Sequence, residues 1–87
     1  MDTDQIFGWF DKPVPVSVGL THDVRNISNA RQALDILMNH WPSAGTQQHR
    51  DARQACLEVL RGERRPEDAR KAFAEAARGA GILFELG

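Results

Sequence analysis

The sequence predicts an α+β fold in which three short, mostly antiparallel strands form a small sheet covered on one face by a layer of three helices. Apolar residues alternate with polar ones near both ends of the chain, and they recur at helical spacing in between. One helical layer on a small sheet buries all of these apolar faces with few elements. The order is therefore β-β-α-α-α-β. An all-α three-helix bundle with extended ends is the alternative.

Two strands are expected first, joined by a polar turn. Alternation over residues 14–20 predicts a strand with one buried face, and residues 24–27 predict a short returning strand. Residues 21–23 supply the turn. Because Pro15 has no N–H to donate to a neighbouring strand, we expect it at an edge of the sheet.

Three helices are expected next. Ser28 is a good N-cap for the first helix, which Pro42 ends. Thr46 can cap the second, and Pro66 suits the first turn of the third. The predicted apolar stripes are Ala30, Ala33, Leu34, Leu37, Met38 and Trp41 on the first helix, Ala52, Ala55, Cys56, Val59 and Leu60 on the second, and Ala69, Ala72, Phe73, Ala76, Ala77 and Ala80 on the third.

A third strand is expected to close the chain. Gly62 follows the second helix, and Gly79 or Gly81 ends the third. Alternating apolar residues over 82–86 then predict the last strand. Residues 1–9 are expected to form an N-terminal arm and residues 10–87 a single α+β domain.

Composition excludes several classes of protein. A hydrophobic content of 41% and a net charge of −1 argue against disorder, and they provide no general attraction to nucleic acid or an anionic membrane. A single cysteine, an acidic start and no apolar run of about 20 residues point to a cytoplasmic protein. No cofactor is expected.

Four segments, "FDKPVPVSVG", "ISNARQALDILMNHWP", "HRDARQACLEVLRG" and "ARKAFAEAARGAGI", follow one another at characteristic spacing. In this order they resemble the domain-of-unknown-function family 982, small proteins of rhizobial and related alphaproteobacteria. The resemblance covers roughly residues 10–86. It implies a compact, single-domain bacterial protein and carries over no catalytic or binding residue.

Catalytic and metal chemistry find little support in the sequence. His49 and Cys56 are seven residues apart on one helix, about 10.5 Å along its axis, which is too far for a nucleophile–base pair. Cys56 also lies on the apolar stripe. The spacing of His22, His40, His49 and Cys56 matches no common metal motif. We therefore expect no catalytic or metal-binding residues and a protein that is not an enzyme.

The stretch "HWPSAGTQQHR" contains the pair most like a polar pocket. Trp41 and His49 both lie on apolar faces, and the short loop between them lets the two helices turn back. The pair predicts either a small polar pocket or, as the favoured interpretation, a helix corner in which both rings point inward.

Arginines gather at the turn before the third helix. Arg61, Arg64, Arg65 and Arg70 are a possible anion contact, for phosphate or nucleic acid. Nearby acidic residues favour a solvated, balanced turn instead. Nucleic acid is therefore not the favoured partner.

Some apolar residues fall outside the predicted stripes. Ile36 and Leu57 are expected to be exposed, and with Trp9 or the Pro15 strand they would form a contact surface. The sequence thus favours a non-enzymatic protein–protein interaction or regulatory module, whose partner is another protein or a second copy in a homodimer.

Overall fold

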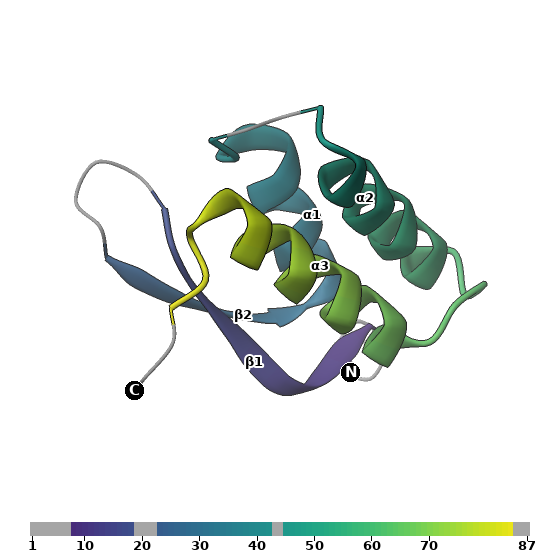
Figure 1. Ribbon diagram of the computed structural model, residues 1–87. Helices are drawn as coiled ribbons and strands as arrows, with labels where there is room; N and C mark the ends of the chain where they lie inside the picture. Colours follow the sequence, from purple (N-terminus) through teal and green to yellow (C-terminus); the bar gives the residue numbers. More distant parts are fainter. Residues whose placement is uncertain (1–7, 19–22, 43–44, 85–87) are drawn as a thin grey trace.

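The computed structural model describes residues 8–18, 23–42 and 45–84. In these ranges a β-hairpin is followed by three helices (Figure 1). In chain order the elements are β1 (Trp9–Ser17), β2 (Val24–Asn29), α1 (Ala30–Asn39), α2 (Gln47–Leu60) and α3 (Pro66–Ala80). The predicted α+β class is confirmed, and the all-α alternative is wrong.

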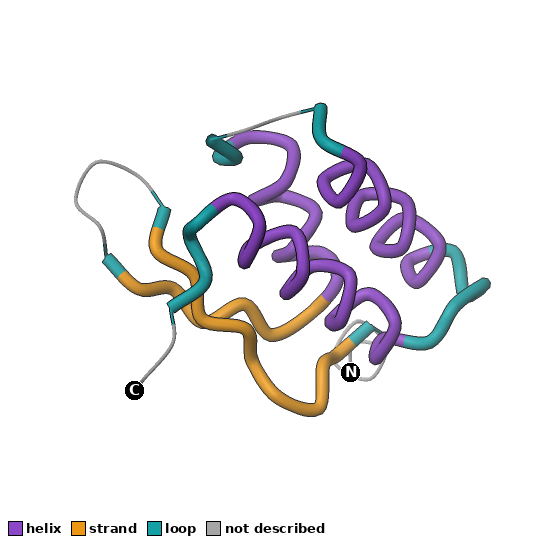
Figure 2. Tube along the Cα trace, in the orientation of Figure 1, coloured by secondary structure: helices purple, strands orange, loops and turns teal. Residues whose placement is uncertain are grey.

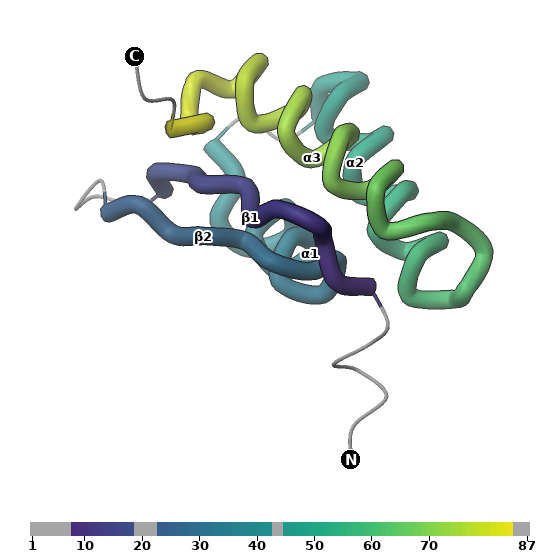
Figure 3. The backbone as a smooth tube through the Cα atoms, turned by 90° about the horizontal axis from the view of Figure 1, so that it is seen from below, coloured from purple at the N-terminus to yellow at the C-terminus, as the bar shows by residue number. Residues whose placement is uncertain are grey.

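The three helices lie on one side of the hairpin, as the purple helices and orange strands of Figure 2 show. α3 contacts β1, α1 contacts β2, and α2 packs against both of these helices. Viewed from below, in Figure 3, the hairpin crosses in front of α1, and α3 lies beside it with α2 behind. Within the described residues, no helix is both long and apolar enough to cross a membrane.

β1 and β2 form an antiparallel hairpin. Val14 faces Ile27 across the ladder, and both are buried against the helices. β1 begins at Trp9, earlier than predicted, because Trp9 pairs with Asn29 at the end of β2. The register shifts between Trp9 and Val14. This irregularity separates the start of β1 from the alternating residues, beginning at Val14, from which the strand was predicted.

The predicted three-stranded sheet is not confirmed. The described residues form a two-stranded sheet, and residues 82–84 meet β1 only through an isolated antiparallel bridge between Val16 and Leu83. The end of the predicted strand, residues 85–86, lies outside the described residues.

Backbone donors explain why this bridge stays isolated. Pro15 accepts a hydrogen bond from the Phe84 N–H at 2.9 Å, but it has no N–H to return. The Ile82 N–H donates to Ala77 O at the end of α3, at 3.0 Å, and so is not available to β1. In an antiparallel ladder both backbone groups of a residue point to the same side. The missing donor of Pro15 therefore faces residues 82–84 and leaves the pairing with β2 intact.

α1 begins one residue later than predicted. Its N-cap is Asn29, whose side-chain oxygen accepts a hydrogen bond from the Gln32 N–H at 2.8 Å. Gln32 Oε1 in turn accepts from the Ser28 N–H at 2.8 Å. The pair satisfies two backbone donors in the manner of a capping box. The prediction of Ser28 as the cap was therefore wrong by one residue. Ser and Asn cap helices about equally well, so residue preference alone does not choose between Ser28 and Asn29.

The buried face of α1 is turned relative to the prediction. Ile36, expected to be exposed, is only 2% exposed, whereas Met38, expected in the core, is 62% exposed. The cause is that α1 packs against β2 on one side, where Ile36 and Ile27 line the same groove. The apolar residues of α1 span a wide arc, and their spacing alone does not show which edge of it a neighbour covers.

α2 and α3 begin as predicted. Thr46 Oγ1 accepts a hydrogen bond from the His49 N–H at 3.1 Å, and Pro66 occupies the first turn of α3. Gly62 follows α2 with a φ of 79°, and Gly81 ends α3 with a φ of 75°. Both angles lie in the left-handed region that favours glycine. Of the two glycines expected to end α3, the structure selects Gly81.

The hydrophobic core lies between the hairpin and the helices. Phe73 is its largest fully buried side chain, and the alanines Ala69, Ala76 and Ala77 of the same helix are buried with it. The buried hydrophobic residues are Phe10, Val14, Val16, Val18, Ile27, Ala30, Ala33, Ile36, Leu37, Ala52, Ala55, Cys56, Val59, Ala69, Phe73, Ala76 and Ala77.

Candidate functional site

The corner between α1 and α2 brings Trp41 and His49 together. Their ring centroids are 5.8 Å apart, and His49 is only 2% exposed. His49 Nε2 lies 2.8 Å from the carbonyl oxygen of Leu37. Because a carbonyl only accepts, Nε2 carries the proton and donates it. His49 thus satisfies one of the carbonyls that the last turn of α1 leaves without a helical partner.

The second ring nitrogen of His49, Nδ1, is buried and has no hydrogen-bond partner among the described residues. It is closed off from solvent, so it is not an open polar site. The Trp41–His49 pair therefore packs a helix corner, which is the interpretation the sequence favours over a polar pocket.

Cys56 is a buried, unreactive thiol. It is free and lies on the apolar face of α2. Burial raises the pKa of its thiol to about 12, because desolvation disfavours the thiolate. Only the thiolate is a good nucleophile. His49, the candidate base, donates to Leu37 and does not serve Cys56.

The metal candidates do not gather. Within the described ranges, no group of three His, Cys, Asp or Glu side chains could hold a metal ion. His40 is exposed at the end of α1, whereas His49 and Cys56 are buried. His22 lies outside the described residues.

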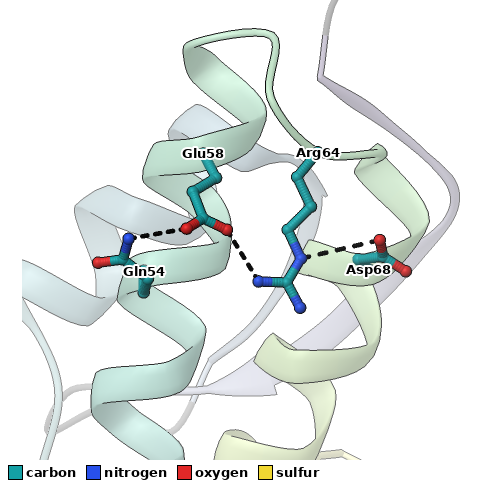
Figure 4. A network of polar contacts seen from close by, with 4 residues as sticks. All are labelled: Gln54, Glu58, Arg64 and Asp68. Atoms are coloured by element: carbon teal, nitrogen blue, oxygen red, sulfur yellow. Dashed lines mark hydrogen bonds and ion pairs between the residues drawn. The ribbon is translucent and has the colours of Figure 1, made fainter.

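Arg64 of the arginine-rich turn links two helices. Its Nη1 lies 2.9 Å from Glu58 Oε1 on α2, and its Nε lies 3.7 Å from Asp68 Oδ2 on α3 (Figure 4). Gln54 donates a second hydrogen bond to Glu58 at 2.8 Å. The bonds from Gln54 and Arg64 lower the pKa of the Glu58 carboxyl.

Arg70 makes a separate ion pair. Two of its nitrogens donate to the two carboxylate oxygens of Glu67, at 2.9 and 2.6 Å. This bidentate contact lowers the pKa of Glu67. Arg61 and Arg65 are exposed. The structure therefore does not converge the four arginines on one anion, and it engages two of them with carboxylates of the same chain.

The four residues expected to form a contact surface do not share one. Trp9 is 41% exposed at the start of β1, and Pro15 is half-buried in the middle of the same strand. Ile36 is buried, which corrects the expectation that it is exposed. Leu57 is half-buried on α2.

An open groove of about 490 Å³ between α1 and α2 gathers apolar side chains instead. Leu34 and Met38 line it from α1, and Leu57 lines it from α2. Met38 is the most exposed large apolar side chain in the described residues. The polar lining residues are Arg31, Asp35, Asn39 and Arg53. We call this the α1–α2 groove.

A second groove of about 400 Å³ runs between α1 and β2. Its lining residues are Arg25, Asn26, Ile27, Arg31, Gln32, Asp35 and Ile36. Arg31 and Asp35 line both grooves. The exposed face of α1 is therefore a ridge between two hollows, with a cation and a carboxylate on it.

Comparison with known proteins places this fold and sequence in a family. Residues 12–84 match the family described as protein of unknown function DUF982. The chain belongs to the DUF982 family. Its fold is also that of the Agrobacterium tumefaciens protein Atu1219, solved by NMR, with a TM-score of 0.75 and 33% identity over 93% of this chain and 79% of that one. No curated protein matches the chain.

Sequence reasoning missed most of the groove in this DUF982 chain. Leu34 and Met38 were assigned to the core, and Arg53 was not singled out. One signal was present: six apolar residues between Ala30 and Met38, at 100° per residue, cover too wide an arc for one narrow stripe. At least one of them had to lie at an exposed edge.

Proposed function

We propose that this DUF982 protein is a non-enzymatic protein–protein interaction module that binds its partner through the α1–α2 groove. The observation that carries the proposal is the exposure of Met38 beside Leu34 and Leu57 in an open hollow. A contiguous apolar surface framed by polar residues is typical of a binding site.

The chemistry of the groove suits protein recognition. Met38 is unbranched and polarizable, so it adapts to different partner shapes. Asp35 and Arg53 frame the groove from opposite helices and offer charged contacts of both signs. An apolar centre with a polar rim is the usual anatomy of a protein interface.

A non-enzymatic role is supported by the state of the two reactive candidates. Cys56 is buried with a raised pKa, and His49 Nε2 is engaged by Leu37. We also infer a bacterial, cytoplasmic setting. This inference is supported by the free Cys56 and by the similarity to an Agrobacterium tumefaciens protein.

The alternative function, a nucleic-acid or phosphate contact at the arginine-rich turn, has less support. Arg64 and Arg70 direct their donors to carboxylates of the same chain. An incoming anion would have to displace those carboxylates, and a net charge of −1 supplies no general attraction.

Matched surface variants test the proposed function. We expect M38K to reduce capture of the partner from an extract of the native bacterium about tenfold, because it places a charge in the apolar hollow. V24K is the control, since Val24 is also an exposed apolar residue, at 44%, but lies on β2. Capture by immobilised protein is quantified by mass spectrometry. Equal capture by M38K, V24K and the wild type would refute the proposal.

A further inference from the structure

The exposed ridge of α1 carries opposite charges one helical turn apart. Arg31 and Asp35 are four residues apart, about 6 Å along the axis, and each lines both grooves. Asp35 Oδ1 accepts a hydrogen bond from Asn39 Nδ2 at 2.8 Å, which holds the carboxylate on the ridge. A surface at α1 therefore presents a cation and an anion in a defined order.

This charge order is opposite to what the helix dipole favours. A helix is stabilised by acidic residues in its first turn and by basic residues in its last turn. α1 has neither, and Arg31 stands at its second position. Residues that break a local rule of this kind are expected where a surface serves another purpose.

The order of charges is complementary to itself. If two copies of α1 cross antiparallel about a two-fold axis midway between Arg31 and Asp35, each Arg31 meets the Asp35 of the other copy. Leu34 of both copies then lies close to the axis. Such an isologous contact uses the same patch on both subunits, as most homodimers do.

We propose that the partner bound by this surface is a second copy of the chain, with α1 packed antiparallel on α1 and reciprocal Arg31–Asp35 pairs across the two-fold axis. This inference rests on the proposed function and names the partner. Leu34 and Met38 supply the apolar contacts, and the α1–α2 groove of each copy receives side chains from the other. Because each copy contributes the exposed face of one ten-residue helix, we expect a weak dimer whose population depends on concentration.

Charge reversal tests the arrangement. Sedimentation velocity from about 10 μM to about 1 mM follows the monomer–dimer equilibrium of the full chain. We expect R31D alone and D35R alone each to raise the dimer Kd about tenfold, since the symmetry puts two like-charged contacts in every dimer. Circular dichroism confirms that each variant is folded.

Restoring dimerisation with complementary variants is the more specific test. Mixing the two single variants restores attraction at both contacts, so R31D and D35R together are expected to form a heterodimer of nearly wild-type affinity. The double variant R31D/D35R is expected to dimerise by itself for the same reason. A loss of folding in one variant would not be rescued by mixing.

Three outcomes would overturn this inference. In the first, the wild-type chain stays monomeric at about 1 mM, but its capture of protein from the extract still depends on Met38. A different protein then fills the groove, so the proposed function holds and the homodimer is wrong. In the second, the wild-type chain dimerises, but neither R31D nor D35R changes the dimer Kd. The dimer then forms through an interface other than α1. If the wild-type chain stays monomeric and M38K captures as much protein from the extract as the wild type does, both the homodimer and the proposed function are wrong.

Discussion

His49 joins both ends of the corner between α1 and α2. Its backbone N–H donates to Thr46 at the start of α2, and its ring donates to Leu37 at the end of α1. The ring also packs on Trp41, which in turn packs on Phe73 with centroids 5.7 Å apart. One side chain therefore links a cap, a helix terminus and the aromatic part of the core.

We expect H49A to lower the free energy of unfolding by about 2–4 kcal/mol, because it removes a buried ring and leaves the Leu37 carbonyl without its donor. H40A is the control, since His40 is exposed, and it should cost less than about 0.5 kcal/mol. Urea unfolding followed by circular dichroism measures both. Equal stability of H49A and H40A would show that the corner does not depend on the ring.

Cys56 makes stability depend on pH on the alkaline side. The folded pKa, about 12, lies above the ordinary value of 9.0, so the folded state keeps its thiol protonated. The contribution is complete below about pH 9 and is lost as pH rises toward 12. We expect stability to fall more steeply with rising alkaline pH in the wild type than in C56A. Parallel pH dependences would contradict the assignment.

The ends of the helices show what each glycine contributes. Gly81 ends α3 with a φ of 75°, and a Cβ there would meet no atom within 4 Å. The cost of a side chain at Gly81 is therefore backbone strain alone. Gly79 lies within α3 without a left-handed angle, and a Cβ would only touch Gln48 Cδ at 4.0 Å.

These two glycines predict changes of opposite sign. G81A should destabilise the protein by about 1 kcal/mol, because alanine is strained in the left-handed region. G79A should stabilise it by up to about 1 kcal/mol, because alanine favours a helix interior. Thermal unfolding of the two variants checks the prediction. Shifts of the same sign would mean that α3 ends differently.

At the scale of the whole molecule, the largest fully buried side chain, Phe73, contributes strongly to the packing of the two layers. Phe73 is fully buried on α3, which contacts β1, α1 and α2. For 87 residues, a stability of roughly 4–13 kcal/mol is expected. The cavity left by one large side chain is therefore a substantial part of the total.

We expect F73A to cost about 3–5 kcal/mol, from lost burial and the cavity that remains. F84A is the control, because Phe84 is 41% exposed and its backbone bond to Pro15 does not need the ring. It should cost less than about 1 kcal/mol. Chemical denaturation measures both. A similar loss for F84A would place the centre of the core elsewhere.

Local signals were sufficient for much of this fold. Thr46 and Pro66 start helices as predicted because capping and proline geometry depend on neighbours in sequence. Trp41 and His49 meet because the loop between them is short. Ser28 was wrong as a cap because the adjacent Asn29 is an equally good one, and residue preference alone does not decide between them.

The candidate site was less predictable. Leu57, expected to be exposed, is half-buried, and Ile36 and Met38 were exchanged between core and surface. The sequence favoured a charge-balanced turn at the arginines, but it did not show that Arg64 joins α2 to α3. Each of these outcomes depends on which element lies next to the side chain.

The sequence by itself determined the α+β class, the order of the described elements and the starts of α2 and α3. These follow from periodicity and from caps, which act over a few residues. Only the tertiary structure decided that Met38 lies open, that Ile36 is covered by β2, and that residues 82–84 form one bridge in place of a strand. The physical reason is that burial and hydrogen bonding between strands depend on which two elements lie side by side. The Ile82 N–H, for example, donates to Ala77 in α3 and is not available to β1.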